Sequence, residues 1–311
     1  MSIIAGTWDL NPSSPAPAEL KLDGPTYHED SILLLDERIP VSAEDIQPGG
    51  KYRSIAKLFI RYAGQEPEDT RYAMATGWLI RDDILVTAGH CAFDWTLKDT
   101  EGLGRAVEVK AYIGYHGKAS VNEGLLASGS VQFRYGVKVV TTEGWLKGGS
   151  DRNNDVAFVQ LNRPFDDLTP FEYQSTPLLG SEVIGVVGYP ADRIYKEESG
   201  GQMYEEFRQT RWNLDHSAGK LLEYRINTFR GQTGAPVLLK SNHASIGTHV
   251  YGGPEKNAAS VIGEHGNPYA EYIPVFDRSF PEVSLLTPRP GVTYVEIQAT
   301  DIRGANPEEE S

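Results

Sequence analysis

The stretch Gly77-Trp78-Leu79-Ile80-Arg81-Asp82-Asp83-Ile84-Leu85-Val86-Thr87-Ala88-Gly89-His90-Cys91 decides the fold of this chain. Its two apolar runs, residues 77–80 and 84–88, predict a pair of short antiparallel strands. The second run leads directly into His90, so an ionisable side chain follows a buried strand.

Outward from this stretch, segments rich in β-branched and aromatic residues recur, with Gly, Asn, Asp or Pro in most gaps. The only candidate for helical periodicity covers residues 270–280, and the 32 glycines suit sharply bent strands. The pattern therefore predicts an all-β chain built as barrels or a sandwich. The expected strands cover residues 57–62, 73–80, 84–88, 107–115, 131–141, 156–161, 183–189, 203–214, 221–228, 237–240 and 244–251.

The chain is acidic: 29 basic and 43 acidic residues among 311 give a formal net charge of −14. Such a surface repels phosphate backbones and anionic lipid, so we expect neither nucleic acid nor membrane as a partner. No apolar run approaches the roughly 18 residues that cross a bilayer.

The two ends of the chain are expected to lie outside the barrels. Residues 1–50, rich in Pro, Ser and Ala at 11–18, are expected to form an arm or prosegment, and residues 281–311 a C-terminal extension with a polar tail. The start carries no secretory pattern, so we expect a cytoplasmic protein unless a signal was removed before this numbering begins. The single cysteine, Cys91, permits no intramolecular disulfide, which favours a reducing compartment or a family without disulfides.

Two further segments carry chemistry together with His90. Asp155 immediately precedes the apolar run 156–161, and Thr233 lies on a glycine-flanked tight loop before a strand. A hydroxyl becomes a useful nucleophile when a histidine accepts its proton and a carboxylate orients that histidine. Asp151 competes with Asp155 for the carboxylate role, but the buried run directly after Asp155 favours Asp155.

In order and kind, these three motifs resemble the chymotrypsin-like serine proteases over roughly residues 36–280. The resemblance implies two antiparallel six-stranded β-barrels, at residues 51–165 and 166–280, with the active site in the cleft between them. It implies that His90 is the base, Asp155 the orienting carboxylate and Thr233 the nucleophile. It further implies that the backbone N–H groups of Gly231 and Thr233 form the oxyanion hole.

Thr233 departs from the family, which has serine at this place. The added γ-methyl restricts χ1 and crowds the substrate carbonyl. Three interpretations stay open: a weak threonine nucleophile, a naturally silenced protease, or a substitution that lets substrate bind uncut. A structural interpretation also stands, in which the hydroxyl only satisfies backbone groups of its loop.

The segments around Thr233 look like the staphylococcal V8 branch, the glutamyl endopeptidases. In that branch a threonine five residues before the nucleophile and a later histidine line the primary pocket, which implies that Thr228, His249 and Gly252 bind substrate here. An imidazole and a hydroxyl can donate hydrogen bonds to a glutamate carboxylate. The competing interpretation makes His249 a core histidine bonded to the backbone.

We therefore expect an endopeptidase that cleaves a protein or peptide substrate after glutamate. The alternative is a silent pseudoprotease that binds acidic peptides or a protein partner. A third alternative is an effector domain from a larger intracellular defence protein. We expect no cofactor and no metal, because the remaining histidines lack ligand spacing and the paired glycines at 200–201 lack the rest of a phosphate loop. Cys91 is expected to be a small buried filler without a redox role.

Overall fold

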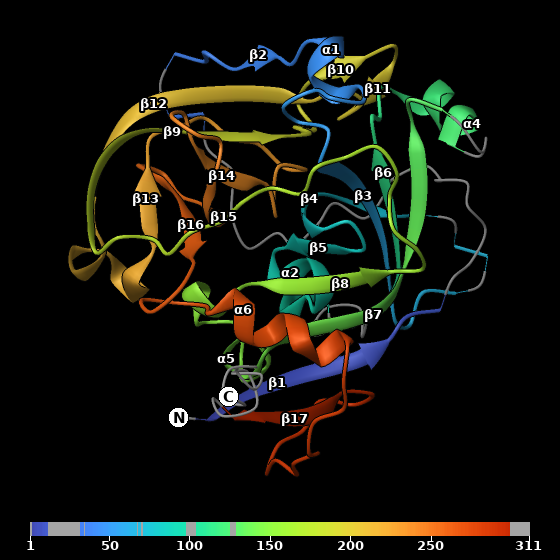
Figure 1. Cartoon of the computed structure of the whole chain (residues 1–311), viewed down its shortest axis with the longest axis vertical. Coiled ribbons are helices and arrows are strands. Elements are labelled where there is room, and N and C mark those ends of the chain that lie inside the picture. Colours follow the sequence, from blue (N-terminus) through green and yellow to red (C-terminus); the bar gives the residue numbers. More distant parts are fainter. Residues whose placement is uncertain are drawn as a thin grey trace, which may run out of the picture.

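The computed structural model describes residues 2–11, 32–33, 35–66, 68–69, 71–97, 104–124 and 129–298 (Figure 1). Residues 12–31 of the expected arm and residues 299–311 of the expected tail lie outside the described residues. The described chain forms two curved β-sheets, each with its own apolar core.

The first sheet has eight strands, six of which close into a barrel because β7 pairs with both β6 and β8. Strands β1 and β17 extend the sheet outward from β7. The strands, in sheet order, are β17 (Thr293–Gln298), β1 (Ser2–Asp9), β7 (Gln132–Thr142), β6 (Ala106–Ile113), β3 (Ile55–Tyr62), β4 (Ala73–Arg81), β5 (Ile84–Thr87) and β8 (Ala157–Leu161).

Alternation along the strands explains how this barrel buries two faces. On β3, Leu58 and Ile60 belong to the core inside the barrel, while Ile55 and Phe59 belong to a second cluster on the other face. Successive side chains of a strand point to opposite faces, so one strand serves both clusters. The barrel is therefore covered on its outside as well, which explains why β3 is buried almost throughout.

The second sheet has seven strands and curls into a half-barrel. Within the described chain, no strand pairing joins its ends, and the short β2 occupies part of the free edge of β12 at Tyr204 and Glu205. Its strands, in sheet order, are β13 (Leu222–Tyr224), β16 (Asn257–Val261), β15 (Ser245–Gly252), β14 (Pro236–Leu239), β9 (Leu179–Gly188), β12 (Tyr204–Asn213) and β2 (Ile39–Pro40). A separate hairpin joins β10 (Ile194–Tyr195) to β11 (Glu198–Ser199).

Helices are short and connect strands. Among the helices of the described residues, none has the length and apolar character needed to cross a membrane. The α-helices are α1 (Ala43–Ile46), α2 (Gly89–Ala92), α4 (Val121–Gly124), α5 (Glu143–Leu146) and α6 (Tyr269–Tyr272). The 3-10 helices are η1 (Lys118–Ser120), η2 (Arg152–Asn154), η3 (Leu214–His216), η4 (Ala218–Lys220) and η5 (Ile273–Phe276).

The all-β fold class is confirmed, with the correction that the second barrel is a half-barrel. Each of the eleven expected strands coincides with a strand of the structure, from β3 to β9 and from β12 to β15. All of β3 to β8 lie in the first sheet and β9 to β16 follow in the second half of the chain, on either side of residue 165. The helical pattern expected over 270–280 corresponds to α6 and η5.

The expectation that residues 1–50 form an arm is wrong for residues 2–9, because β1 is a strand of the first sheet. Likewise β17, inside the expected C-terminal extension, pairs with β1 along six residues. Side chains of β1 are buried in consecutive positions from Ala5 to Trp8, so the strand shows no alternating pattern in the sequence. Gly6 lets β1 approach closely, since a Cβ there would lie 2.2 Å from Leu146.

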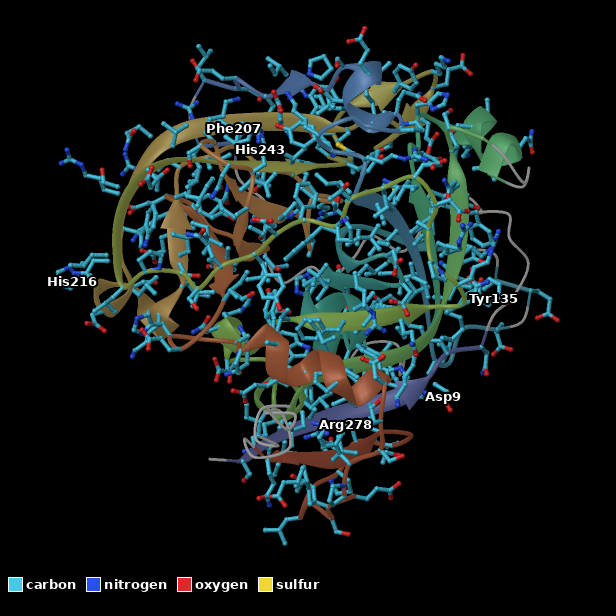
Figure 2. All side chains as sticks on the ribbon, in the orientation of Figure 1. Asp9, Tyr135, Phe207, His216, His243 and Arg278 are labelled. Atoms are coloured by element: carbon cyan, nitrogen blue, oxygen red, sulfur yellow. The ribbon has the colours of Figure 1, made fainter. Side chains whose placement is uncertain are left out.

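Side chains fill the interior of both sheets in Figure 2, where Asp9 marks the end of β1.

We predict that Trp8→Ala lowers the free energy of unfolding by about 3–5 kcal/mol, because a large buried ring is lost. The Trp8 side chain is 5% exposed and its indole N–H donates to the Ala106 carbonyl at 2.9 Å. Urea unfolding measures the change.

The matched control is Leu286→Ala, since Leu286 is a fully exposed apolar residue near β17. That variant should stay within about 0.5 kcal/mol of the parent. Equal stability of the two variants would contradict the inclusion of β1 in the folded barrel.

Candidate active site

His90 lies in α2, immediately after β5, and it is held by a single carboxylate. The backbone N–H of His90 donates to Asp155 Oδ1 at 2.8 Å, and His90 Nδ1 lies 2.7 Å from Asp155 Oδ2. Asp155 is fully buried and His90 nearly so. Because both carboxylate oxygens contact the same residue, the ring can neither rotate nor shift without breaking a charge-assisted hydrogen bond.

Gly89 makes this contact possible. A Cβ at Gly89 would lie 2.9 Å from the Val156 nitrogen and 3.0 Å from Asp155 Oδ1. Any larger residue at position 89 would therefore push Asp155 and Val156, which lead into β8, away from α2. The Trp145 ring, with its centroid 6.1 Å from that of His90, lies beside the imidazole.

The turn before Asp155 is anchored from both sheets. Thr142 donates its hydroxyl proton to the Asn154 carbonyl at 2.6 Å, which fixes the turn to the first sheet. Asn153 accepts from the Val261 N–H at 3.0 Å and donates to the His265 carbonyl at 3.0 Å, which fixes it to the second. Asp151, the competing carboxylate, is exposed and accepts a hydrogen bond from Asn154.

Thr233 lies on a glycine turn that packs against the chain just before His90. A Cβ at Gly234 would lie 2.2 Å from the Thr87 hydroxyl and 3.0 Å from the Ala88 nitrogen, so only glycine permits this approach. Both Gly231 and Gly234 also have positive φ, at 90° and 86°. The loop therefore meets the segment that carries His90. A hydrogen bond from the Thr233 hydroxyl to His90 Nε2 stays a prediction.

Thr76, on β4, fastens this loop, and the sequence analysis did not single it out. Its N–H donates to the Thr233 carbonyl at 2.9 Å, and its hydroxyl donates to the Gly231 carbonyl at 2.6 Å. The same hydroxyl accepts from the Tyr189 N–H at 3.1 Å. Thr76 stands one residue before the quoted strand pair, but its partners lie more than 110 positions away, so no local pattern could find it.

The expected pocket residues Thr228 and His249 are both fully buried. His249 Nδ1 lies 2.6 Å from the Tyr224 hydroxyl. Its backbone pairs with the two residues after Thr233: its N–H donates to the Ala235 carbonyl and its carbonyl accepts from the Gly234 N–H, both at 2.8 Å. The Thr228 hydroxyl has no hydrogen-bond partner among the described residues. Gly252, the third expected pocket residue, ends β15.

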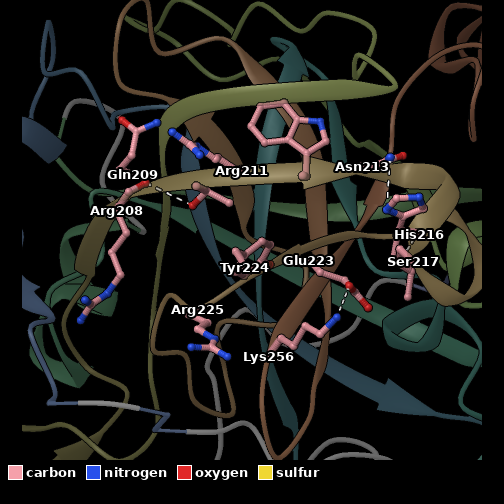
Figure 3. Close-up of a pocket in the computed structure, with 13 residues that line it drawn as sticks. Arg208, Gln209, Arg211, Asn213, His216, Ser217, Glu223, Tyr224, Arg225 and Lys256 are labelled. Carbon is pink, nitrogen blue, oxygen red and sulfur yellow. Dashed lines mark hydrogen bonds and ion pairs between the residues drawn. The ribbon is translucent and has the colours of Figure 1, made fainter.

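A cavity of about 530 Å³ lies along β12, with Tyr224 in its wall. Figure 3 shows Tyr224 beside Glu223, which forms an ion pair with Lys256. Because the Tyr224 hydroxyl holds His249, this cavity lies against the support of the expected pocket rather than against Thr233. Neither Thr228 nor His249 lines this cavity.

Asp94, also missed by the sequence analysis, is a second buried carboxyl close to His90. Its Oδ1 accepts from the N–H groups of Thr96 and Leu97 at 2.8 and 3.2 Å, whereas Oδ2 has no partner in the described part of the chain. Burial raises the pKa of Asp94 to about 6, against a lowering by nearby His90. Four residues after the histidine, it was indistinguishable from a turn aspartate in the sequence.

Cys91 is buried in the core of the first barrel, and burial raises the pKa of its thiol well above the ordinary value. Over the described residues, no group of three or more His, Cys, Asp or Glu side chains is placed to hold a metal ion.

Comparison with known proteins assigns the family. The family model for the trypsin-like peptidase domain matches residues 75–247, a range that contains His90, Asp155 and Thr233. This chain belongs to the trypsin-like peptidase family.

Two curated relatives of this trypsin-like peptidase come from Bacillus. The chain is 26% identical over 256 residues to a protein of Bacillus subtilis named extracellular metalloprotease, covering 78% of this chain and 70% of that protein. It is 23% identical over 257 residues to the glutamyl endopeptidase of Bacillus licheniformis, covering 76% of this chain and 66% of that protein.

Solved structures share the fold of this trypsin-like peptidase. A Glu endopeptidase solved in complex with MPD has a TM-score of 0.59 and 19% identity, covering 79% of this chain and 99% of that chain. The HL collagenase has a TM-score of 0.52 and 15% identity, covering 79% of this chain and all of that chain, at 100%. The chymotrypsin-like fold expected from the sequence is thereby confirmed.

The raised pKa of Asp94 predicts a pH-dependent stability. The pKa of the Asp94 carboxyl is 3.8 in the unfolded chain and about 6 in the folded protein. The folded state therefore binds the proton more tightly, and the stability that this proton contributes is lost as pH rises from about 4 to 6. Asp94→Asn removes this loss. Relative to the parent, the variant should gain free energy of unfolding between pH 4 and pH 7, by at most about 3 kcal/mol.

Urea unfolding at four pH values measures the difference. Asp151→Asn, at an exposed carboxyl four residues before Asp155, serves as the control and should show no such trend. A difference between Asp94→Asn and parent that is independent of pH would contradict the assignment.

Proposed function

We propose that this trypsin-like peptidase hydrolyses peptide bonds after glutamate, with Thr233 as nucleophile, His90 as base and Asp155 as the orienting carboxylate. The backbone N–H groups of Gly231 and Thr233 stabilise the oxyanion. The observation that carries the proposal is the 2.7 Å contact of Asp155 with His90 Nδ1, made by a fully buried carboxylate.

The first step is attack by the Thr233 hydroxyl oxygen on the scissile carbonyl carbon. His90 Nε2 takes the hydroxyl proton as the new C–O bond forms, and the carbonyl π electrons move to the oxygen. Nε2 is the ring nitrogen that accepts this proton, because Nδ1 is held at Asp155. The buried carboxylate also stabilises the imidazolium that results.

In the second step the tetrahedral intermediate collapses and the C–N bond breaks. His90 returns the proton to the departing amine, which leaves an ester on Thr233 that water hydrolyses by the same route. The positive φ of Gly231 supports an oxyanion role, since it turns the loop sharply where N–H groups must face the substrate. The N–H of Gln232, between the two proposed donors, is turned back to the Phe229 carbonyl at 3.0 Å.

The γ-methyl of Thr233 limits this chemistry. A threonine hydroxyl has a restricted χ1, and the backbone of Thr233 is held by its bond to Thr76 and by the close packing of Gly234 on Thr87 and Ala88. The hydroxyl can therefore not be aimed by moving the backbone. A misplacement of about 1 Å costs on the order of a hundredfold in rate.

The preference for glutamate rests on Thr228 and His249. A buried hydroxyl without a partner is costly, and a substrate carboxylate would supply the missing acceptor. His249 adds a ring held by Tyr224 without a fixed positive charge. The glutamyl endopeptidase among the relatives supports the same specificity. The net charge of −14 slows the encounter with acidic peptides but leaves the pocket chemistry unchanged.

We predict that Thr233→Ser raises kcat/KM for a fluorogenic glutamyl peptide by at least about a hundredfold, or roughly 2.7 kcal/mol of barrier. The variant removes one methyl and leaves His90, Asp155 and the loop glycines in place. Addition of His90→Ala to the serine form should abolish the gain, because the base is lost.

Two results would contradict this account of the nucleophile. If the serine form is as inert as the parent while both fold and bind the peptide, the chain is a silent peptidase that only binds. If the parent already matches the serine form, the steric argument about the methyl fails.

We further predict that Thr228→Val reduces kcat/KM of the serine form on the glutamyl peptide by at least about tenfold, and on a leucyl peptide by less than about twofold. The substitution keeps the shape and removes the hydroxyl that would bond the carboxylate. Thr7→Val is the matched control at another buried threonine, and it should leave the ratio between peptides unchanged. Equal losses on both peptides would make Thr228 structural.

A further inference from the structure

Residues 35–41, called here the N-terminal segment, lie along the second half-barrel although they precede the first barrel in sequence (Figure 1). Within it, β2 pairs with β12, Ile39 opposite Glu205 and Pro40 opposite Tyr204. The Val41 N–H donates to the Met203 carbonyl at 2.9 Å. The segment is thus fixed at its far end by backbone pairing.

Arg38 is the centre of the segment, and its side chain has no exposed surface. Its guanidinium donates to Asp36 through Nε at 3.0 Å and Nη2 at 2.9 Å, and to Asp192 through Nη1 at 2.9 Å and Nη2 at 2.5 Å. Arg193 reaches the same Asp36 carboxylate at 2.5 Å. A buried guanidinium held by two bidentate carboxylates has one geometry, because losing either partner would leave a buried charge uncompensated.

Asp192 connects this ion cluster to the loop of Thr233. The neighbouring Ala191 donates its N–H to the Arg230 carbonyl at 2.6 Å. The next residue, Gly231, packs so tightly on the Tyr189 carbonyl that a Cβ would lie 2.3 Å from that oxygen. Residues 189–192 thus form the wall against which the proposed oxyanion loop rests.

The chain just before the N-terminal segment contacts the other end of the same loop. Asn227 is fully buried, accepts from the Leu33 N–H at 2.8 Å and donates to the Leu35 carbonyl at 3.1 Å. Asn227 directly precedes Thr228. Leu33 and Leu35 therefore touch the loop at Asn227, and Arg38 reaches it through Asp192 and Ala191 at Arg230.

We propose that the N-terminal segment holds the 227–233 loop in the conformation that presents the Gly231 N–H, with Arg38 and Asp192 as positioning residues. The inference rests on the proposed function, in which that N–H stabilises the oxyanion. A turn with two positive-φ glycines has other accessible peptide orientations. A donor of this kind is effective only if its direction is set before charge develops on the substrate.

Hydrogen exchange of the 226–235 peptide tests the proposal without catalysis. Arg38→Gln should speed its exchange at least about tenfold, while peptides from β3 and β6 keep their rates. The exchange rate in Arg38→Lys should fall between those of the parent and Arg38→Gln, since lysine keeps the charge but lacks the planar guanidinium that bonds both carboxylates. Arg71→Gln is the matched control, because it breaks an Arg–Asp pair at Asp69, on the first barrel. Unchanged exchange in Arg38→Gln would overturn the proposal, and so would equal acceleration in every peptide.

Kinetics of the Thr233→Ser form give a second readout. Arg38→Gln and Asp192→Asn should each lower kcat at least about tenfold with KM within about threefold, because the oxyanion contact acts in the transition state. The variant that combines both substitutions should show no larger fall in kcat than the more impaired single variant, because both substitutions break the same ion pair. A fall confined to KM would overturn the proposal. If the serine form itself is inert, the proposed function fails, and the exchange measurement still decides the role of the segment.

Discussion

The two-point contact between the Asp155 carboxylate and His90 is the constraint on which the rest of the site depends. A fully buried carboxylate needs hydrogen-bond donors, and here both of its oxygens find them on one residue. The contact therefore requires β5 and β8 to be neighbours in the first sheet, and it requires glycine at position 89. The pairing of β5 with β8 supplies that neighbourhood, so the geometry of the site depends on this pair of strands.

The second half-barrel adds the loop of Thr233, and Thr76 joins this loop to the first barrel. One hydroxyl of β4 bonds both the Tyr189 and the Gly231 segments, and the N–H of the same residue bonds Thr233. The loop thus takes its position from the barrel that carries His90. With the backbone fixed in this way, the identity of the hydroxyl residue matters greatly, because a γ-methyl cannot be accommodated by a small shift of the loop.

The N-terminal part of the chain serves both sheets. Strand β1 extends the first sheet and pairs with β17, while β2 and the buried Arg38 cluster belong to the second. A buried ion cluster is weak support for overall stability, because desolvation offsets the attraction between its charges. Its directional hydrogen bonds instead select one arrangement of the segments that it joins, which is the property a preorganised loop requires.

Local pattern was enough for the eleven strands that alternate or run apolar between turn residues, and for the order of His90, Asp155 and the glycine-flanked Thr233. These features depend only on residues that are neighbours in sequence, since strand periodicity and positive-φ glycines are local properties. Only the tertiary structure brought in β1 and β16, whose residues are small or buried in succession and show no alternation. It also revealed Thr76, Asp94 and Arg38, and it added burial as a second difference between Asp155 and Asp151, which the sequence had distinguished only by the apolar run after Asp155. Their partners lie far away in sequence or depend on burial, and neither distance in space nor loss of solvent is encoded in a residue's immediate neighbours.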